Sequence, residues 1–401
     1  MRKPTSKAAP ARLRVTPAAG MSTAIPRGYH TIALVLQGGG ALGAYQGGVY
    51  EALVEAGCHP NWIAGISIGA LNAAIIAGNP PERRVERLRE FWQTICQSPL
   101  LPGFAAAALP LAADLTGALR GAVSGWSVWR TLSEGQAGFF APRLPPAYWL
   151  PPTGPDRASY YDTAPLRATL ERLVDFDRIN APRQMRVSVG AVNVRTGNFV
   201  YFDNTEQTLR PEHFMASGAL PPGFPAVQID GEYYWDGGMV SNTPLYQVLS
   251  DEGHRNALVF QVDLWSAAGP LPVDLPQVAE RSKDIQYSSR TRLVTEFMRR
   301  KQEQQRLLHD LMALVPAAKH ADPAFRQAQA HASRARVNVV HLIYRDKPYE
   351  GHYKDYEFSD ASRRMHWSSG MEDMRHTLSH GHWLDLPDGE EPFVVHDVHR
   401  G

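Results

Sequence analysis

Residues 31–43 of the chain read Thr-Ile-Ala-Leu-Val-Leu-Gln-Gly-Gly-Gly-Ala-Leu-Gly, and residues 62–69 read Trp-Ile-Ala-Gly-Ile-Ser-Ile-Gly. Each stretch begins with a short, nearly continuous apolar run, which is typical of a strand buried on both faces of a parallel sheet. Each run ends in a turn, and helical patterns follow over residues 44–56 and 68–77. The order strand, glycine turn, helix, strand, serine turn, helix predicts an α/β fold with a mainly parallel sheet.

The rest of the chain extends this pattern. Residues 186–194 and 198–202 predict paired strands around a glycine turn, and residues 257–264 predict another buried strand. Residues 275–315 predict a long amphipathic helix pair, rich in Arg, Gln and Glu. Further elements are predicted over residues 81–96, 164–174, 211–218 and 359–378 (helices) and 227–235 and 336–344 (extended).

Composition narrows the functional classes. The chain has 401 residues, with 41 Lys and Arg against 40 Asp and Glu, a formal net charge of +1 and 44% hydrophobic residues. This profile is typical of a folded globular protein. A near-neutral balance gives no electrostatic reason to expect nucleic-acid binding. The two cysteines, Cys58 and Cys96, are too few for a disulfide framework or a cysteine-rich metal site.

The N-terminal stretch differs from the rest. Residues 1–30 hold six basic side chains, no acidic one and four prolines, and they lack the apolar core of a secretory signal. We expect a disordered basic leader there, with a transit-like segment as the alternative, and Met21 could serve as the start. Prolines break the uncharged stretch 91–113, so no transmembrane helix is predicted. We expect a cytoplasmic protein that can contact a membrane peripherally.

Residues 99–158 form another kind of region. They are rich in Pro, Gly and Ala and carry several large aromatic side chains. A long stretch of low predicted structure inside a compact domain is typical of a functional loop. We expect an apolar, cap-like insertion over a pocket, in which Trp126 and Trp129 are exposed and able to touch a membrane surface.

Ser67 is the candidate nucleophile. It stands in a Gly-x-Ser-x-Gly string between an apolar strand and an alanine-rich helix. A serine in such a turn is exposed to substrate, and Gly65 and Gly69 tolerate the strained backbone and leave out side chains that would clash. The helix N-terminus behind it favours developing negative charge. The alternative interpretation is a plain helix N-cap.

The glycine run Gly38 to Gly43 fits Gly-x-Gly-x-x-Gly after a strand, which raises the alternative of a dinucleotide or phosphate loop. That function needs an acidic residue about 20 residues further on. Residues 58–60 read Cys-His-Pro, so this residue is missing. A glycine run also exposes backbone N–H groups that stabilise an oxyanion, which is the interpretation we favour.

A serine nucleophile needs a base, and the histidines offer no convincing one. His213 lies in a predicted short helix. His376, His380 and His382 lie with Glu372 near the C-terminus, without a recognisable metal-ligand motif. This cluster favours a solvated tail over a metal site.

Asp236 is the stronger candidate base. It precedes Gly237 and Gly238, so its carboxylate can sit in a tight turn close to another backbone segment. The aromatic residues 233–235 before it would limit water and raise its basicity. The alternative is a simple hairpin turn, because Asp-Gly is a turn signal.

Together, the glycine loop, the Gly-x-Ser-x-Gly turn and the Asp-Gly-Gly motif resemble the patatin-like phospholipase family. The resemblance covers residues 31–250 and includes residues 215–221, before Asp236, and residues 242–245, after it. It implies a three-layer α/β/α catalytic domain. Residues 251–401 would then supply the last strand or strands and a mostly helical extension, similar to that of a bacterial subgroup.

The resemblance also implies a Ser–Asp dyad. By position, Ser67 is the nucleophile and Asp236 the proton acceptor, with Gly65, Gly69, Gly237 and Gly238 as their flanking glycines. The implied oxyanion hole comprises residues of the glycine loop: Gly38, Gly39, Gly40, Ala41 and Gly43. This chain has Leu42 where many family members have Arg or Lys. That departure leaves the acyl chemistry intact and weakens the expectation of a phospholipid headgroup preference.

We therefore expect a serine acyl-ester hydrolase acting on lipids, of the phospholipase, lysophospholipase or lipid-esterase type. Its partner would be a lipid or acyl-ester substrate, and it would need no metal or organic cofactor. One alternative is a histidine-dependent α/β-hydrolase or thioesterase that uses a C-terminal histidine. Another is a catalytically silent lipid-binding protein. The sequence leaves the oligomeric state open.

Overall fold

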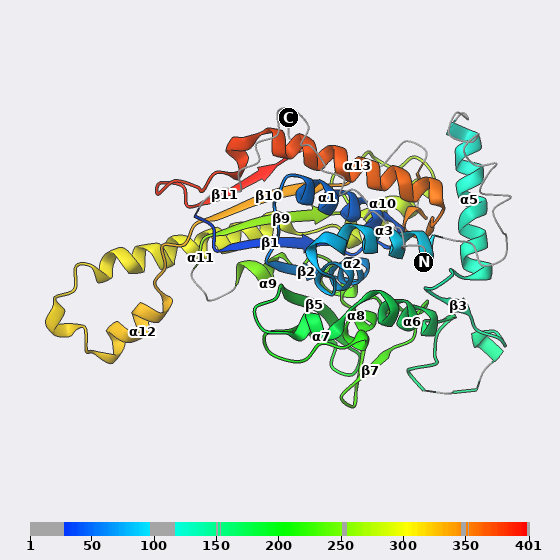
Figure 1. The fold of residues 1–401 in the computed structure, drawn as a ribbon, viewed down its shortest axis with the longest axis horizontal. Helices are drawn as coiled ribbons and strands as arrows, with labels where there is room; N and C mark the ends of the chain where they lie inside the picture. Colours follow the sequence, from blue (N-terminus) through cyan, green and yellow to red (C-terminus); the bar gives the residue numbers. More distant parts are fainter. Residues whose placement is uncertain are drawn as a thin grey trace, which may run out of the picture.

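The computed structural model describes residues 28–96, 117–149, 151–152, 154–250, 255–345, 350–351 and 353–398, with residues 117–124 as backbone alone. The predicted leader and the first part of the predicted cap, residues 99–116, lie outside these ranges except for residues 28–30. The described residues form a mixed, mostly parallel sheet with helices on both faces (Figure 1). This is the predicted α/β fold.

Nine strands make up this sheet within the described residues, in the order β11-β10-β9-β1-β2-β5-β8-β7, with β6 beside β5. The strands are β1 (Thr31–Leu36), β2 (Trp62–Gly65), β5 (Arg186–Asn193), β6 (Phe199–Asp203), β7 (Val227–Ile229), β8 (Glu232–Asp236), β9 (Ala257–Asp263), β10 (Val337–Ile343) and β11 (Phe393–Asp397). The strands from β11 to β5 pair in parallel, and β6, β7 and β8 pair antiparallel. A separate two-stranded antiparallel sheet pairs β3 (Ala141–Pro142) with β4 (Tyr161–Asp162).

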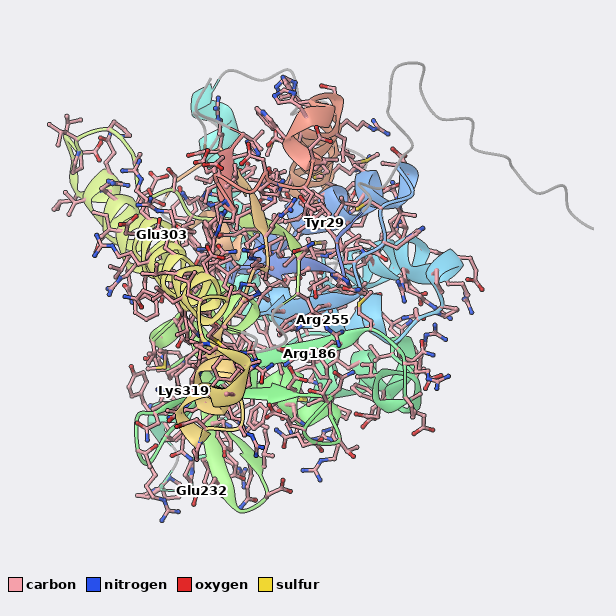
Figure 2. All side chains as sticks on the ribbon, turned by 90° about the vertical axis from the view of Figure 1, so that its left-hand side faces the viewer. Tyr29, Arg186, Glu232, Arg255, Glu303 and Lys319 are labelled. Atoms are coloured by element: carbon pink, nitrogen blue, oxygen red, sulfur yellow. The ribbon has the colours of Figure 1, made fainter. Side chains whose placement is uncertain are left out.

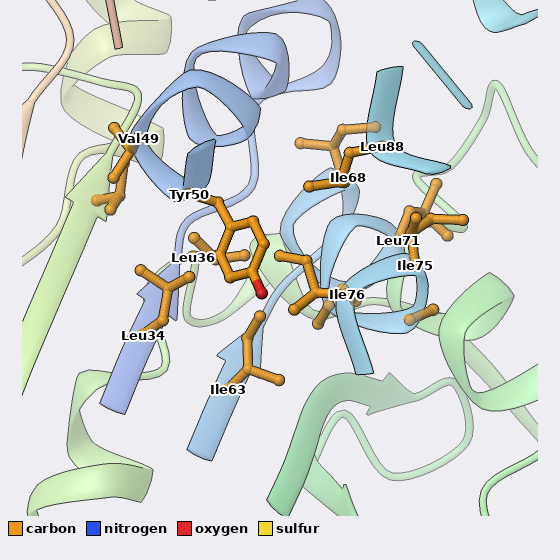
Figure 3. Close-up of a cluster of buried hydrophobic side chains, with 14 of the residues drawn as sticks. Leu34, Leu36, Val49, Tyr50, Ile63, Ile68, Leu71, Ile75, Ile76 and Leu88 are labelled. Carbon is orange, nitrogen blue, oxygen red and sulfur yellow. The ribbon is translucent and has the colours of Figure 1, made fainter. Parts of the chain in front are cut away.

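The continuous apolar runs have a direct structural cause. In β1, Leu34 and Leu36 enter one hydrophobic cluster, whereas Ala33 and Val35 enter another on the opposite face of the sheet. The first cluster includes side chains of α1 (Ala44–Glu55), α2 (Ile68–Ala77), α3 (Arg84–Ile95) and α13 (Asp360–Ser379). Figure 3 shows its centre, where strand residues meet side chains of α1 and α2. The second cluster includes side chains of α9 (Leu245–Leu249) and α11 (Thr291–Met312).

The remaining helices lie around this core. They are α5 (Gly117–Glu134), α6 (Ala164–Leu173), α7 (Phe176–Asn180), α8 (Pro211–Ser217), α10 (Leu275–Tyr287) and α12 (Pro323–His331). Short 3₁₀ helices are η1 (Gly40–Gly43), η2 (Pro81–Arg83), η4 (Ala147–Trp149), η5 (Gly237–Met239), η6 (Ala317–Lys319), η7 (Lys354–Tyr356) and η8 (Gly381–Leu384). No helix of the described residues is long and apolar enough to cross a membrane.

The region after residue 250 is mostly helical, as predicted, and it also completes the sheet. β10 lies within residues 336–344, which predict a strand, whereas β11 was not predicted. Helices α11 and α12 extend away from the sheet as an arm (Figure 1). Figure 2, in which this arm faces the viewer, labels Glu303 and Lys319 along it.

Two local expectations need correction. The predicted cap is not a stretch of low structure throughout, because residues 117–134 form helix α5. This segment contains no proline, and its polar and apolar residues alternate at a helical spacing. The Asp236-Gly237 pair is not a hairpin turn, because β8 ends there and η5 follows. The hairpin turn lies earlier, at Asp230 and Gly231 between β7 and β8.

Candidate active site

Ser67 lies in the sharp turn between β2 and α2. Its backbone has φ 54° and ψ −124°, a conformation that side-chain-bearing residues rarely adopt. The flanking glycines make the turn possible. A Cβ on Gly65 would lie 2.4 Å from the Gly69 carbonyl oxygen, and one on Gly69 would lie 2.4 Å from the Leu36 carbonyl oxygen. The turn presents Ser67 to a pocket, and the Ser67 side chain makes no N-cap hydrogen bond to α2.

Asp236, the last residue of β8, lines the same pocket as Ser67. Its Oδ1 accepts a hydrogen bond of 2.7 Å from the Gly238 amide. The residue is only 2% exposed. Burial raises the pKa of Asp236 to about 7, although the Ser67 hydroxyl and the hydrogen bond from the Gly238 amide oppose the shift. A carboxylate of this basicity can accept a serine proton near neutral pH.

The glycine loop lies against both residues. A Cβ on Gly38 would lie 3.0 Å from the Ser67 Cβ, and one on Gly40, whose φ is +54°, would lie 2.2 Å from the Asp355 carbonyl oxygen. The Gly38 amide already donates to the Asn242 carbonyl, at 3.2 Å. No hydrogen bond among the described residues uses the amides of Gly39 or Gly40 as donors. These two N–H groups are therefore the ones available to an oxyanion.

The other glycine-loop residues have packing positions. Ala41 and Leu42 are buried in the hydrophobic core. A Cβ on Gly43 would lie 2.6 Å from Cγ1 of Ile68, so this glycine lets η1 pack on α2. None of the three lines the pocket. The position where many family members carry a cation is therefore a core position in this chain.

The glycines after Asp236 are needed for close packing. A Cβ on Gly237 would lie 2.6 Å from the Gly190 carbonyl oxygen, and one on Gly238 would lie 2.8 Å from Oδ1 of Asn242. Only without these side chains can the segment after Asp236 pack against both β5 and the Asn242 side chain.

The pocket lining has an apolar and a polar part. Besides Ser67, Asp236 and the glycine loop, the polar or amphipathic lining residues are Asn242, Trp265, Tyr287, Asp355 and Tyr356. The apolar lining residues are Ile68, Leu71, Phe139, Phe140, Leu220, Phe224 and Phe358. Phe139 and Phe140 belong to the predicted cap. Trp126 and Trp129 do not line the pocket; they are 61% and 58% exposed, with their rings stacked at 5.1 Å.

The histidines considered as bases lie elsewhere. His213 is buried in α8, where its Nδ1 accepts from the Arg210 amide at 2.9 Å. His376, His380 and His382 lie at the end of α13 and in η8, and their rings contact one another. None of the four lines the pocket. Among the described residues, no three His, Cys, Asp or Glu side chains are grouped as a metal site would require.

Several site residues were not predicted as such. Ser217 accepts a hydrogen bond from the Ser67 amide at 3.0 Å, and Asn242 donates to the Gly38 carbonyl at 3.0 Å. Both lie in segments that carried the family resemblance, residues 215–221 and 242–245, so the sequence contained a signal that could have identified them. Trp265, Tyr287 and Asp355 stand in no motif, and only the fold brings them to the site.

Comparisons with known proteins assign the chain to a family. A family model described as patatin-like phospholipase matches residues 34–249, and another described as patatin phospholipase matches residues 285–390. The first match spans more than half of the chain, so the chain belongs to the patatin-like phospholipase family, a family of lipid acyl hydrolases. Among solved structures, VipD from Legionella pneumophila has a TM-score of 0.37 and 14% identity, covering 88% of this chain and 67% of VipD. A sequence comparison with curated proteins finds no match.

Proposed function

We propose that the protein is a serine acyl-ester hydrolase that acts on lipids through a Ser67–Asp236 dyad. The observation that carries this proposal is that Ser67, in a strained turn between a strand and a helix, and the buried Asp236 carboxyl group line one pocket. Membership in a lipid-hydrolase family supports the substrate class. The apolar lining around Phe139, Phe140 and Phe224 suits an acyl chain.

The reaction would proceed in two steps. Ser67 Oγ attacks the ester carbonyl carbon while Asp236 takes the hydroxyl proton, and the amides of Gly39 and Gly40 hold the oxyanion. Asp236 returns the proton to the departing alcohol, which leaves an acyl-enzyme on Ser67. A water molecule then attacks this ester, with Asp236 again accepting a proton and passing it to Ser67.

Hydrolysis of 4-nitrophenyl esters from acetate to palmitate, by wild type, Ser67→Ala and Asp236→Asn, tests this function. We expect both variants to lose activity, and the best chain length reports the size of the acyl pocket. Activity that survives in Asp236→Asn but disappears in variants of His376, His380 or His382 would favour a histidine-dependent hydrolase instead. Binding of lipid without release of fatty acid by wild type would favour a silent lipid-binding protein.

We also propose that α5 contacts the membrane surface from which lipid substrate is drawn. The support is the stacked, exposed pair Trp126 and Trp129, since exposed tryptophans favour the membrane interface. Replacing both by Ala should weaken cosedimentation with phospholipid vesicles and leave hydrolysis of a dissolved short-chain ester unchanged. Unchanged vesicle binding would contradict the membrane contact.

A further inference from the structure

The region after residue 270 contributes tyrosine hydroxyl groups to the catalytic pocket. Tyr287, at the end of α10, and Tyr356, in η7, both line the pocket that contains Ser67 and Asp236. Both residues lie in the segment matched by the second patatin model. No hydrogen bond to either hydroxyl is found among the described residues, so both phenols are available to a substrate.

Tyr287 is anchored directly to the glycine loop. Its carbonyl oxygen accepts a hydrogen bond of 2.8 Å from Nδ2 of Asn242, and the same nitrogen donates to the Gly38 carbonyl at 3.0 Å. Nε2 of Gln37, the residue before the loop, also donates to the Tyr287 carbonyl, at 3.1 Å. The position of Tyr287 is therefore fixed relative to the loop that would hold the oxyanion.

The Tyr287 ring is held as well. It packs against Trp265 with 5.5 Å between ring centroids, and Nε1 of Trp265 donates to the Gly38 carbonyl at 2.8 Å. Backbone and ring contacts thus both connect Tyr287 to the glycine loop. A residue held through both its backbone and its ring is suited to a defined role toward a substrate.

The surroundings keep the Tyr287 phenol in its neutral, donating form. Burial and the nearby carboxylates of Asp236 and Asp355 raise the pKa of Tyr287. A protonated phenol beside Asp236 can donate to an oxygen atom that gains negative charge, because few waters compete with it in a partly buried pocket.

We propose that Tyr287 is a further catalytic residue, whose hydroxyl donates a hydrogen bond to the oxygen of the departing alcohol. This inference rests on the proposed function. During acylation the bond from Ser67 Oγ to the carbonyl carbon forms, and the bond from that carbon to the leaving oxygen breaks. The serine proton passes through Asp236 to the leaving oxygen, and Tyr287 keeps its own proton throughout.

This role makes a selective prediction about substrates. An alkyl alcohol, such as the glycerol part of a lipid, leaves as a poorly stabilised alkoxide, so a hydrogen bond to its oxygen speeds the reaction. A 4-nitrophenolate anion is already stable and gains little from the same bond. Tyr287 therefore matters for natural alkyl esters more than for activated aryl esters.

The experiment compares kcat/KM for ethyl butyrate and 4-nitrophenyl butyrate, which share an acyl group and differ in the leaving group. We expect Tyr287→Phe to lower kcat/KM for ethyl butyrate by ~10- to 100-fold, the range for losing a donor to developing charge, and for the aryl ester by less than ~3-fold. Tyr356→Phe is the matched variant in the same pocket, and Tyr246→Phe, on the exposed surface of α9, is the outside control. We expect neither to distinguish the two esters.

An equal loss on both esters in Tyr287→Phe would reduce Tyr287 to a structural role and overturn the proposal. No loss on either ester would do the same. If Tyr356→Phe and not Tyr287→Phe lowers kcat/KM for ethyl butyrate selectively, Tyr356 donates the hydrogen bond, and the proposal for Tyr287 is overturned. If wild type hydrolyses neither ester, or if Ser67→Ala hydrolyses both, the proposed function itself fails, and this result is distinct from a failure of Tyr287 alone.

Discussion

Different interactions hold each of the two sides of the pocket that contains Ser67 and Asp236. The side formed by the glycine loop and Ser67 depends on backbone segments packed too closely for side chains, as at Gly69, where a Cβ would lie 2.4 Å from the Leu36 carbonyl oxygen. The side formed by α10 and η7 depends on ion pairs. Nζ of Lys283 lies 2.6 Å from Asp355, and Nζ of Lys354 lies 2.8 Å from Asp284.

Because of this difference, we expect the two sides of the pocket to respond differently to substitutions. Where two backbone segments are in close contact, an added methyl group must displace one of them, so even this small substitution should have a large effect. Ion pairs weaken in steps, and a conservative replacement can restore them. We expect changes in the close backbone packing on the glycine-loop side to lower activity more than changes in the ion pairs on the C-terminal side.

The largest effect is expected at the nucleophile. Ser67→Ala should lower kcat for a 4-nitrophenyl ester by ~10⁴-fold or more, as for other serine nucleophiles, because no acyl-enzyme can form. The fold should persist, since Ala differs from Ser only in the hydroxyl. Steady-state kinetics and circular dichroism check this. Activity within ~10-fold of wild type would mean that another residue is the nucleophile.

Asp236→Asn should come next, with a loss of ~10³-fold or more, because an amide cannot accept the serine proton. In wild type, kcat/KM should rise with pH around 7 and level off above it, since the reactive form is the ionised carboxylate. A profile that stays flat from well below to well above neutral pH would contradict the role of Asp236.

The same variant should be more stable than wild type at alkaline pH. Burial raises the folded-state pKa of Asp236 to about 7, above the value of an unfolded Asp, so ionisation destabilises the folded state as pH rises through that value. Asn carries no charge and avoids this cost. We expect the Tm advantage of Asp236→Asn over wild type to grow from pH 5 to pH 8, by thermal unfolding. An advantage that shrinks with pH would contradict the shift.

Gly40→Ala should lower kcat/KM by ~10²-fold, the loss seen when one oxyanion donor is displaced. Gly57→Ala is the matched control, because Gly57 also has a positive φ, +72°, but open space where its Cβ would be. We expect it to lose ~1 kcal/mol of stability and no activity. Equal kinetic losses in the two variants would show that backbone conformation, and not contact with η7, explains the effect.

The smallest effect is expected from the ion pairs. Lys283→Met leaves Asp355 without its closest cation, and we expect kcat/KM to fall by ~10-fold and Tm to fall with it. Lys283→Arg should restore most of both, because the charge returns. A loss in Lys283→Met as large as that in Gly40→Ala would show that the two sides of the pocket do not differ in the way described.

The glycine-loop side of the pocket could be predicted from the sequence, whereas the C-terminal side could not. The strand, turn and helix around Ser67 are determined by neighbouring residues, and the predicted helix over residues 68–77 matches α2. The glycine motifs could likewise be recognised locally, and at Gly40, Gly65, Gly69 and Gly237 an added Cβ would meet a backbone atom first. The choice of Asp236 over the histidines depended on the family resemblance, and the pocket contains Asp236 and none of those histidines.

The C-terminal side could not be predicted in this way. Tyr287 and Asp355 reach the glycine loop only through long-range packing, and their own neighbours in the sequence form no motif. Helix α5 was missed because its glycines and its flanking prolines resemble a loop composition. Strand β11 was missed because its pairing depends on β10, about fifty residues earlier in the chain.

The Ser67–Asp236 dyad is tested most directly by labelling with a fluorophosphonate across a range of pH, followed by peptide mapping. We predict a single adduct on Ser67, a labelling rate that rises with pH with a midpoint near 7, and a rate in Asp236→Asn that is strongly reduced at every pH. An adduct on another residue, or labelling of Ser67 that is as fast in Asp236→Asn as in wild type, would contradict the dyad.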